Sequence, residues 1–259
     1  MMRFSANTGF LWPGLPFLDR IRRAAAAGFD AVEFHDEAQR TDPADLRAAL
    51  AETGLPVIGL NVRMGTTAGC AAIPGQQAQA RRDIDEAIAM ADLCDAAAIH
   101  VLSGNTDAPE AAGVLAENLR HALAATGRVV LIEPICRAAN PAYFLHDLDQ
   151  ALAILAEVAH PRLKILFDCY HIETQHGDCL ARFRAAAGQV GHVQIASIPT
   201  REEPDRGTLD YATLLPAMRA AGYAGAFGCE YRPHAQTGAG TEAGLGWMRA
   251  FRQERRPRP

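Results

Sequence analysis

The chain has 259 residues, of which 49% are hydrophobic and 21% are charged, and its formal net charge is −5. This apolar content excludes intrinsic disorder, and the acidic balance argues against nucleic acid as a partner, because no basic stripe is present to bind a phosphate backbone. No apolar run approaches the roughly 18 residues of a membrane-spanning helix. The start of the chain lacks a secretory signal, and the six cysteines form no CxxC pair, so we expect reduced thiols and a cytoplasmic protein.

Eight short β-type runs alternate along the chain with longer Ala-rich stretches. Several of these runs are apolar on both faces, as in a parallel sheet that is covered by helices. The intervals between them leave room for one loop and one helix in each unit. The predicted strands are Arg3–Asn7, Ala31–His35, Pro56–Val62, Ala98–Ser103, Val129–Ile135, Lys164–Tyr170, Gly191–Ser197 and Ala226–Tyr231.

The stretches between the strands carry helix punctuation. Asp42 is a plausible N-cap, and Gly28 and Gly54 follow the ends of two helices. No linker or change in composition divides the chain, so we expect one domain over residues 1–251, followed by a basic tail over 252–259. The predicted helices are Phe17–Ala27, Pro43–Glu52, Gln76–Asp92, Ala108–Ala125, Asp147–Ala159, Asp178–Ala187 and Ala212–Ala221.

Eight strand-then-helix units in one domain leave two α/β architectures, a closed barrel or a large doubly wound sheet. A doubly wound sheet normally carries a GxGxxG turn after its first strand. Residues 8–11 read Thr-Gly-Phe-Leu, which does not match. The sequence therefore predicts a single (β/α)8 TIM barrel.

Polar residues end four successive predicted strands. Glu133, Asp168, Gln194 and Glu230 follow the apolar parts of strands five to eight. Active sites of such barrels lie at the C-terminal ends of the strands, so these groups converge on one mouth. Three converging carboxylates repel one another unless a cation lies between them, and an all-oxygen ligand set suits Mg²⁺ or Mn²⁺.

This arrangement indicates proton transfer next to a carbonyl group. A bound divalent ion would polarise a substrate carbonyl and its neighbouring hydroxyl and so acidify the C–H bond between them. Glu133 and Glu230 lie far enough apart around the barrel to flank a substrate, one taking the proton and the other returning it. His171 lies on the same rim and is a candidate for binding a substrate oxygen.

Short segments that run in order along nearly the whole chain carry a resemblance to a known family. They are Phe4–Asn7, Pro16–Arg20, Ala25–Phe34, Ile73–Gly75, His100–Asn105, Leu131–Ile135, Asp168–His171, Gly191–Ala196, Ile198–Pro204, Gly228–Tyr231 and Glu242–Trp247. On these segments the sequence resembles the hydroxypyruvate isomerase family of the xylose-isomerase-like barrel superfamily. That family interconverts hydroxypyruvate and tartronate semialdehyde through an enediolate, and close relatives isomerise 2-oxo-tetronates.

The resemblance implies a role for each candidate residue. Glu133, Asp168, Gln194 and Glu230 would hold the metal, and the two glutamates would be the acid/base pair. His171 and Arg201 would contact the substrate, with Arg201 able to grip a carboxylate through two hydrogen bonds. We also assign Asn7 and His35 to substrate binding.

Departures from the family concern the rim of the pocket. Residues 35–39 replace the family's aromatic–Pro–Tyr stretch, Cys136 stands where the family commonly has Asn, and Gly207-Thr208 replaces a Gly-Glu pair. The reaction class is therefore better indicated than the substrate. The roles of Glu33 and Glu37, near the end of the second strand, stay open.

Other reactions on the same barrel are alternatives. A ketose 3-epimerase would use the same metal and two glutamates, and an inosose-type dehydratase would add loss of a β-hydroxyl to the same enediolate. A phosphodiesterase of the abasic-site nuclease type needs several zinc ions and a basic groove, which Gln194 and the net charge do not favour. Barrels of this superfamily often pair, so a homo-oligomer is also an expectation.

Overall fold

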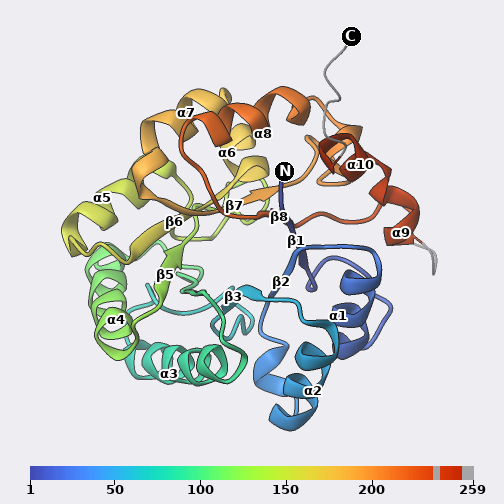
Figure 1. The fold of residues 1–259 in the computed structure, drawn as a ribbon. Coiled ribbons are helices and arrows are strands. Elements are labelled where there is room, and N and C mark those ends of the chain that lie inside the picture. The colour runs from blue at the N-terminus through green and yellow to red at the C-terminus, as the bar shows by residue number, and fades with distance from the viewer. Residues whose placement is uncertain (236–239, 253–259) are drawn as a thin grey trace.

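Eight parallel strands close into a barrel in their chain order, as Figure 1 shows. The structure is a computed structural model that describes residues 1–235 and 240–252. Each predicted strand overlaps one observed strand, so the predicted (β/α)8 barrel is confirmed. The strands are β1 (Phe4–Asn7), β2 (Ala31–Phe34), β3 (Val57–Asn61), β4 (Ala98–His100), β5 (Val129–Ile132), β6 (Leu163–Asp168), β7 (Val190–Ile195) and β8 (Phe227–Cys229).

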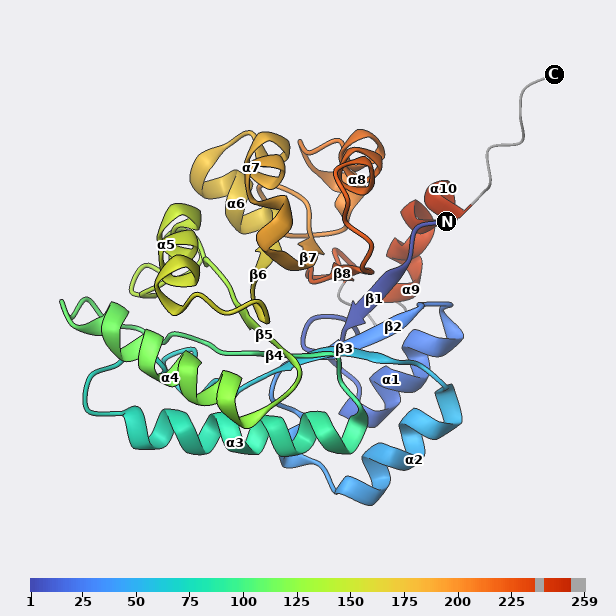
Figure 2. The same cartoon turned by 60° about the vertical axis from the view of Figure 1, so that its left-hand side comes forward.

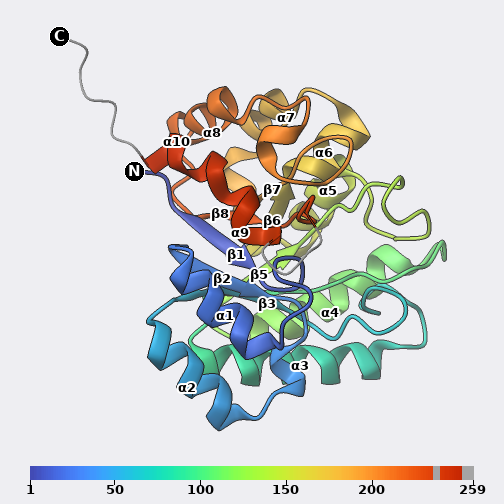
Figure 3. The same cartoon turned by 90° about the vertical axis from the view of Figure 1, so that its right-hand side faces the viewer.

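Helices surround the strands on the outside of the barrel (Figure 1). Figure 2 shows α3 and α4 running side by side, and Figure 3 shows α10 beside the N-terminus, where Phe4 packs on Trp247 with ring centroids 5.0 Å apart. The α-helices are α1 (Phe17–Ala26), α2 (Pro43–Thr53), α3 (Gln77–Cys94), α4 (Ala111–Ala125), α5 (Leu148–Val158), α6 (Cys169–His176), α7 (Cys179–Ala186), α8 (Tyr211–Ala220), α9 (Gly240–Gly244) and α10 (Met248–Arg252). The 3₁₀ helices are η1 (Ala38–Arg40), η2 (Ala187–Gln189), η3 (Pro204–Arg206) and η4 (Leu245–Trp247).

Capping residues set the helix ends much as their sequence predicts. The Asp42 carboxylate accepts hydrogen bonds from the backbone N–H groups at the start of α2, and Gly54 ends this helix with a left-handed φ of 67°. Asp178 caps α7 in the same way. Among the described residues, no helix has the length and apolar character needed to cross a membrane.

The prediction of the sixth strand, Lys164–Tyr170, is wrong at its C-terminal end. β6 stops at Asp168, and α6 begins at Cys169 because the Asp168 carboxylate accepts a hydrogen bond of 2.8 Å from the Tyr170 backbone N–H. Helices α6, α9 and α10 and the 3₁₀ turns were not predicted. Arg252, the first residue of the predicted basic tail, ends α10, and residues 253–259 lie outside the described residues.

The barrel interior is apolar in its lower part and polar at its mouth. Ala98, Leu131 and Leu166 form a buried apolar cluster inside the barrel. Side chains two residues further along a strand face the same way, and each strand carries a polar residue within one position of its C-terminal end. We call this set the polar ring; it comprises Asn7, Glu33, Asn61, His100, Glu133, Asp168, Gln194 and Glu230.

Candidate active site

The polar ring holds four buried carboxylates. Glu33, Glu133, Asp168 and Glu230 are exposed by 6% or less. Two unit charges about 4 Å apart repel by about 4 kcal/mol in surroundings of moderate polarity, so four such groups need positive charge among them. Among the described residues, the guanidinium of Arg201 contacts two of them, Asp168 and Glu230. One guanidinium leaves the mouth with an excess of negative charge that favours a cation.

Two of the predicted metal ligands lie together with His171. One ligand atom from each of Glu133, Asp168 and His171 falls within 4.8 Å of the others. His171 Nε2 is 3.5 Å from Asp168 Oδ2 and 3.7 Å from Glu133 Oε1. The structure therefore places His171, which we assigned to the substrate, among the groups that could hold the cation.

Arg201 bridges two of the four carboxylates. Its Nη2 donates to Asp168 Oδ2 at 3.1 Å and to Glu230 Oε2 at 2.5 Å. The guanidinium lies over the rings of Phe10 and Tyr170, and the Arg201 backbone has a left-handed φ of 56°. Such a φ is unfavourable for a residue with a side chain and often marks a functional site. In this state Arg201 neutralises two predicted metal ligands.

Asn7 and His35, which we assigned to substrate binding, both contact Glu230. Asn7 Nδ2 donates to Glu230 Oε1 at 2.9 Å, and His35 Nε2 lies 3.2 Å from the same oxygen. Burial alone would raise the pKa of Glu230, but Arg201 and His35 outweigh it and lower this pKa to about 2. Glu230 is therefore ionised and held in place from three sides.

Glu133 has the opposite environment. Its Oε1 is buried without a hydrogen-bond partner among the described residues. Burial, together with the charges of Glu230 and Asp168, holds the pKa of Glu133 well above its ordinary value. Burial also raises the pKa of Asp168 to about 7, although Arg201 opposes this shift. Two carboxylates with opposite shifts at one mouth are the usual arrangement of a general acid and a general base.

The oxygen atoms at the mouth fit a hard divalent cation. Gln194 Oε1, like Glu133 Oε1, is buried and accepts no hydrogen bond from the described residues. The amide nitrogen of Gln194 is occupied, because it donates to Glu33 Oε1 at 3.0 Å. Unpaired buried oxygens are costly, and ligation by carboxylate and amide oxygens is what Mg²⁺ and Mn²⁺ prefer. The donor set is compatible with either ion.

The sequence analysis assigned no role to three residues that lie at this site. His100 Nδ1 bonds to Asn61 Oδ1 at 3.1 Å, its Nε2 lies 3.8 Å from Glu133 Oε2, and burial lowers its pKa to about 3. His192 contacts Glu33, and Cys136 Sγ lies 3.2 Å from His171 Nδ1. His192 could have been found, since it stands two residues before Gln194 and shares its face of the strand. His100 was harder to find, because the predicted strand Ala98–Ser103 runs past it, whereas β4 ends at His100.

Glu37 pairs with Arg20. Its Oε1 is 3.7 Å from Arg20 Nη1. Arg20 also donates to the backbone oxygens of Thr8 and Leu15, and so braces the loop between β1 and α1. The side chain of Glu37 therefore contributes to holding that loop.

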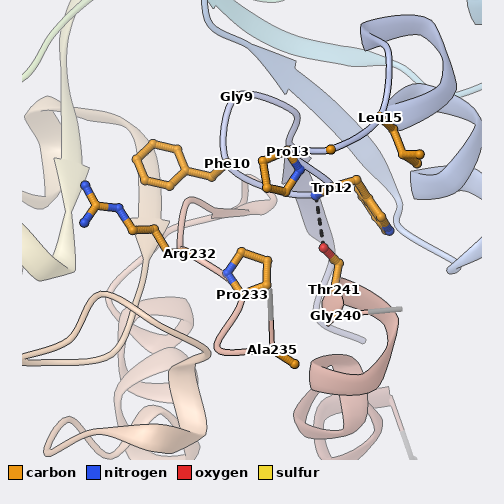
Figure 4. A pocket seen from close by; sticks show the side chains of 11 residues that line it. Gly9, Phe10, Trp12, Pro13, Leu15, Arg232, Pro233, Ala235, Gly240 and Thr241 are labelled. Atoms are coloured by element: carbon orange, nitrogen blue, oxygen red, sulfur yellow. Dashed lines mark hydrogen bonds between the residues drawn. The ribbon is translucent and has the colours of Figure 1, made fainter. Parts of the chain in front are cut away.

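An apolar pocket adjoins the mouth between the loop after β1 and the loop after β8, and Figure 4 shows it. It has a volume of about 470 Å³, and Trp12 N donates to Thr241 Oγ1 at 3.0 Å beside it. Phe10 lines this pocket and also contacts His35 edge-on, with centroids 5.5 Å apart. Because Arg201 lies over the same ring, Phe10 stands between the pocket and the carboxylates of the polar ring.

Comparisons with known proteins identify the family of this chain. A family model described as xylose isomerase-like TIM barrel matches residues 21–251. A 2-oxo-tetronate isomerase of Cupriavidus necator is 40% identical over 262 residues, which cover 97% of this chain and 99% of the relative. The hydroxypyruvate isomerase of Escherichia coli is 35% identical over 263 residues, covering 97% of this chain and all of the relative.

A solved structure is similar over the whole barrel. The structure titled AP endonuclease, family 2, from Brucella melitensis has a TM-score of 0.91 and 34% sequence identity, and the match covers 98% of this chain and 100% of that one. The resemblance to the hydroxypyruvate isomerase family is thus confirmed by relatives that align from end to end. The chain belongs to the xylose isomerase-like TIM barrel family, in the group that contains the proteins named 2-oxo-tetronate isomerase and hydroxypyruvate isomerase.

Proposed function

We propose that this protein is a divalent-metal-dependent isomerase of a small hydroxy-oxo acid or short sugar, of the hydroxypyruvate or 2-oxo-tetronate type. Its relatives are isomerases by name, and the chain is an isomerase of the same family. The observation that carries the mechanism is the pair of glutamates at one mouth, Glu230 with a lowered and Glu133 with a raised pKa.

Glu133, Asp168, Gln194 and Glu230 would hold Mg²⁺ or Mn²⁺, with His171 beside them. When bound, the ion supplies Lewis-acid polarisation of the substrate carbonyl. The unpaired oxygens of Glu133 and Gln194, and the negative charge of the mouth, support this assignment. Magnesium and manganese are equally compatible with the donor set.

Glu230 is suited to remove the proton from the carbon between the carbonyl and the hydroxyl, because its low pKa keeps it ionised. Glu133 is suited to deliver a proton to the neighbouring carbon of the enediolate, because burial and the charges of Glu230 and Asp168 raise its pKa and so strengthen its affinity for a proton. Its neighbour His100 is neutral, and its Nε2 lacks a partner among the described residues, so it can accept a hydrogen bond from a substrate hydroxyl.

The position and charge of Arg201 favour a substrate that carries a carboxylate. Its guanidinium lies at the mouth, 13% exposed, and stays charged because Glu230 and Asp168 outweigh the cost of its burial and keep its pKa raised. A planar guanidinium binds a carboxylate through two parallel hydrogen bonds. Asn7, His35 and His171 surround the same space and would bind the remaining oxygens of the substrate.

Proton NMR in D₂O tests the proposal, with hydroxypyruvate first and then 2-oxo-tetronates and short ketoses, each with Mg²⁺ and with EDTA. We expect metal-dependent C–H exchange that falls by about 10²–10⁴-fold in Glu133→Gln and in Glu230→Gln. Glu157→Gln is the matched control, because this glutamate is half exposed and pairs with Arg120 on the surface. The absence of exchange with every substrate, or full exchange in both glutamine variants, would refute the mechanism.

The same experiment separates the alternatives. A ketose 3-epimerase would invert one carbon without moving the carbonyl, and an inosose-type dehydratase would release water, so the products differ in the spectrum. A phosphodiesterase is not favoured, because four carboxylates and one guanidinium would repel a phosphate backbone. A cytoplasmic location and a homo-oligomeric state stay predictions of the sequence.

A further inference from the structure

We propose that Glu33 is a positioning residue that orients the Gln194 amide, so that the amide oxygen and not the amide nitrogen faces the cation. This inference rests on the metal site of the proposed function. It assigns a role to a buried carboxylate that neither the acid/base pair nor the ligand set uses.

The Glu33 carboxylate is surrounded by hydrogen-bond donors from two other strands. Its Oε1 accepts from Gln194 Nε2 at 3.0 Å and from Asn7 Nδ2 at 3.3 Å. Its Oε2 accepts from His192 at 2.5 Å and from Ser5 Oγ at 3.3 Å. Glu33 is on β2 and both His192 and Gln194 are on β7, so these contacts cross the barrel interior. Glu33 is thus fixed beneath the mouth.

A side-chain amide has a donor end and an acceptor end, and its neighbours decide which way it points. An ionised carboxylate only accepts, so Glu33 requires the NH₂ group of Gln194. The other end of the amide, Oε1, is then left buried with no partner among the described residues. The amide turned the other way would present N–H groups to the cation and an oxygen to Glu33, and both contacts would be repulsive.

The packing below the mouth is built around this contact. Tyr223 contacts His192 Nδ1 at 3.4 Å, while His192 Nε2 binds Glu33. Gly228 leaves the space that these groups occupy, because a Cβ atom there would lie 2.5 Å from Glu33 Oε1 and 2.7 Å from His192 Nε2. A residue that fixes a ligand's orientation typically contributes 10–100-fold to metal affinity.

An exchange of the two side chains tests the orientation. Mn²⁺ affinity is measured by electron paramagnetic resonance of the free ion on the wild type, Glu33→Gln, Gln194→Glu and the double variant. We expect each single variant to bind Mn²⁺ about 10–100-fold more weakly. In Gln194→Glu the affinity for Mn²⁺ falls although the ligand gains a charge, because the new carboxylate faces the carboxylate of Glu33 and is repelled by it. In the double variant the amide stands on β2 and the carboxylate on β7, so one donor again meets one acceptor, and affinity returns to within a few-fold of the wild type.

Glu157→Gln is the matched control, since it makes the same change at a half-exposed glutamate that pairs with Arg120 on the surface, and its Mn²⁺ affinity should stay near that of the wild type. Wild-type affinity in Glu33→Gln, or a double variant no tighter than the weaker single, would overturn the inference while leaving the metal site intact. A wild type that binds no Mn²⁺ would overturn the metal site of the proposed function as well. Where a single variant does not fold, the double variant decides, because it keeps one carboxylate and one amide in contact.

Discussion

Replacing Arg201 by glutamine removes the guanidinium that joins Asp168 to Glu230. Both carboxylates are buried, and the Arg201 side chain is only 13% exposed, so water replaces little of the lost interaction. At the observed 3.1 Å to Asp168, the attraction is about 5 kcal/mol at an effective dielectric constant of about 20, before the cost of burying the charges. Removing one partner of a buried ion pair typically costs about 3–5 kcal/mol.

We therefore expect metal-free Arg201→Gln to be less stable than the wild type by about 3 kcal/mol. For a chain of this size, that corresponds to a fall of roughly 6–12 °C in Tm. The matched control is Arg120→Gln, because Arg120 pairs with Glu157 at 3.4 Å and both side chains are about half exposed. Exposed pairs contribute less than about 1 kcal/mol. The assay is thermal unfolding in EDTA at pH 8, where Asp168 is largely ionised because its pKa is about 7.

Added Mg²⁺ should stabilise Arg201→Gln more than it stabilises the wild type. A cation held by both Asp168 and Glu230 requires the guanidinium to leave its position between them, so part of the binding free energy in the wild type is spent on that displacement. The rise in Tm on adding Mg²⁺ is therefore expected to be larger in Arg201→Gln than in the wild type. Equal stability of the two proteins in EDTA, or a smaller Mg²⁺ effect in the variant, would refute the reasoning.

Two further predictions concern stability. Gly228→Ala should destabilise the fold by about 1–3 kcal/mol in urea unfolding, because its Cβ would collide with Glu33 and His192; Gly113→Ala on α4, with no atom within 4 Å of its Cβ, should not. The raised pKa of Asp168, about 7, favours its protonated form in the folded state, so metal-free stability should decrease as pH rises from about 4 to 7. The lowered pKa of Glu230, about 2, acts in the opposite sense and its contribution is lost below about pH 4. Thermal melts in EDTA between pH 2 and 8 test both pH dependences. Constant stability from pH 5 to 7 would contradict the prediction for Asp168.

Local patterns in the chain are sufficient to predict the barrel. Eight apolar runs that each fit one strand, with a helix between them, can bury their apolar faces together by closing into one sheet. The same rule predicts that Glu133, Asp168, Gln194 and Glu230 meet at one mouth, because parallel strands end at the same side. Asp42 and Gly54 mark the ends of α2 by backbone chemistry that depends on few neighbours.

Contacts between distant segments depend on the closed barrel. Arg201 was predicted as a clamp for substrate, and only the folded loop shows it between Asp168 and Glu230. Asp168 ends β6 and caps α6, a double role that the apolar pattern of residues 164–170 conceals. The contact of Glu33 with His192 and Gln194 joins β2 to β7, which β1 and β8 separate, so it exists only when barrel closure brings these two strands within reach. Strand periodicity determines which face a side chain takes, whereas barrel closure and loop conformation determine which partner it meets there.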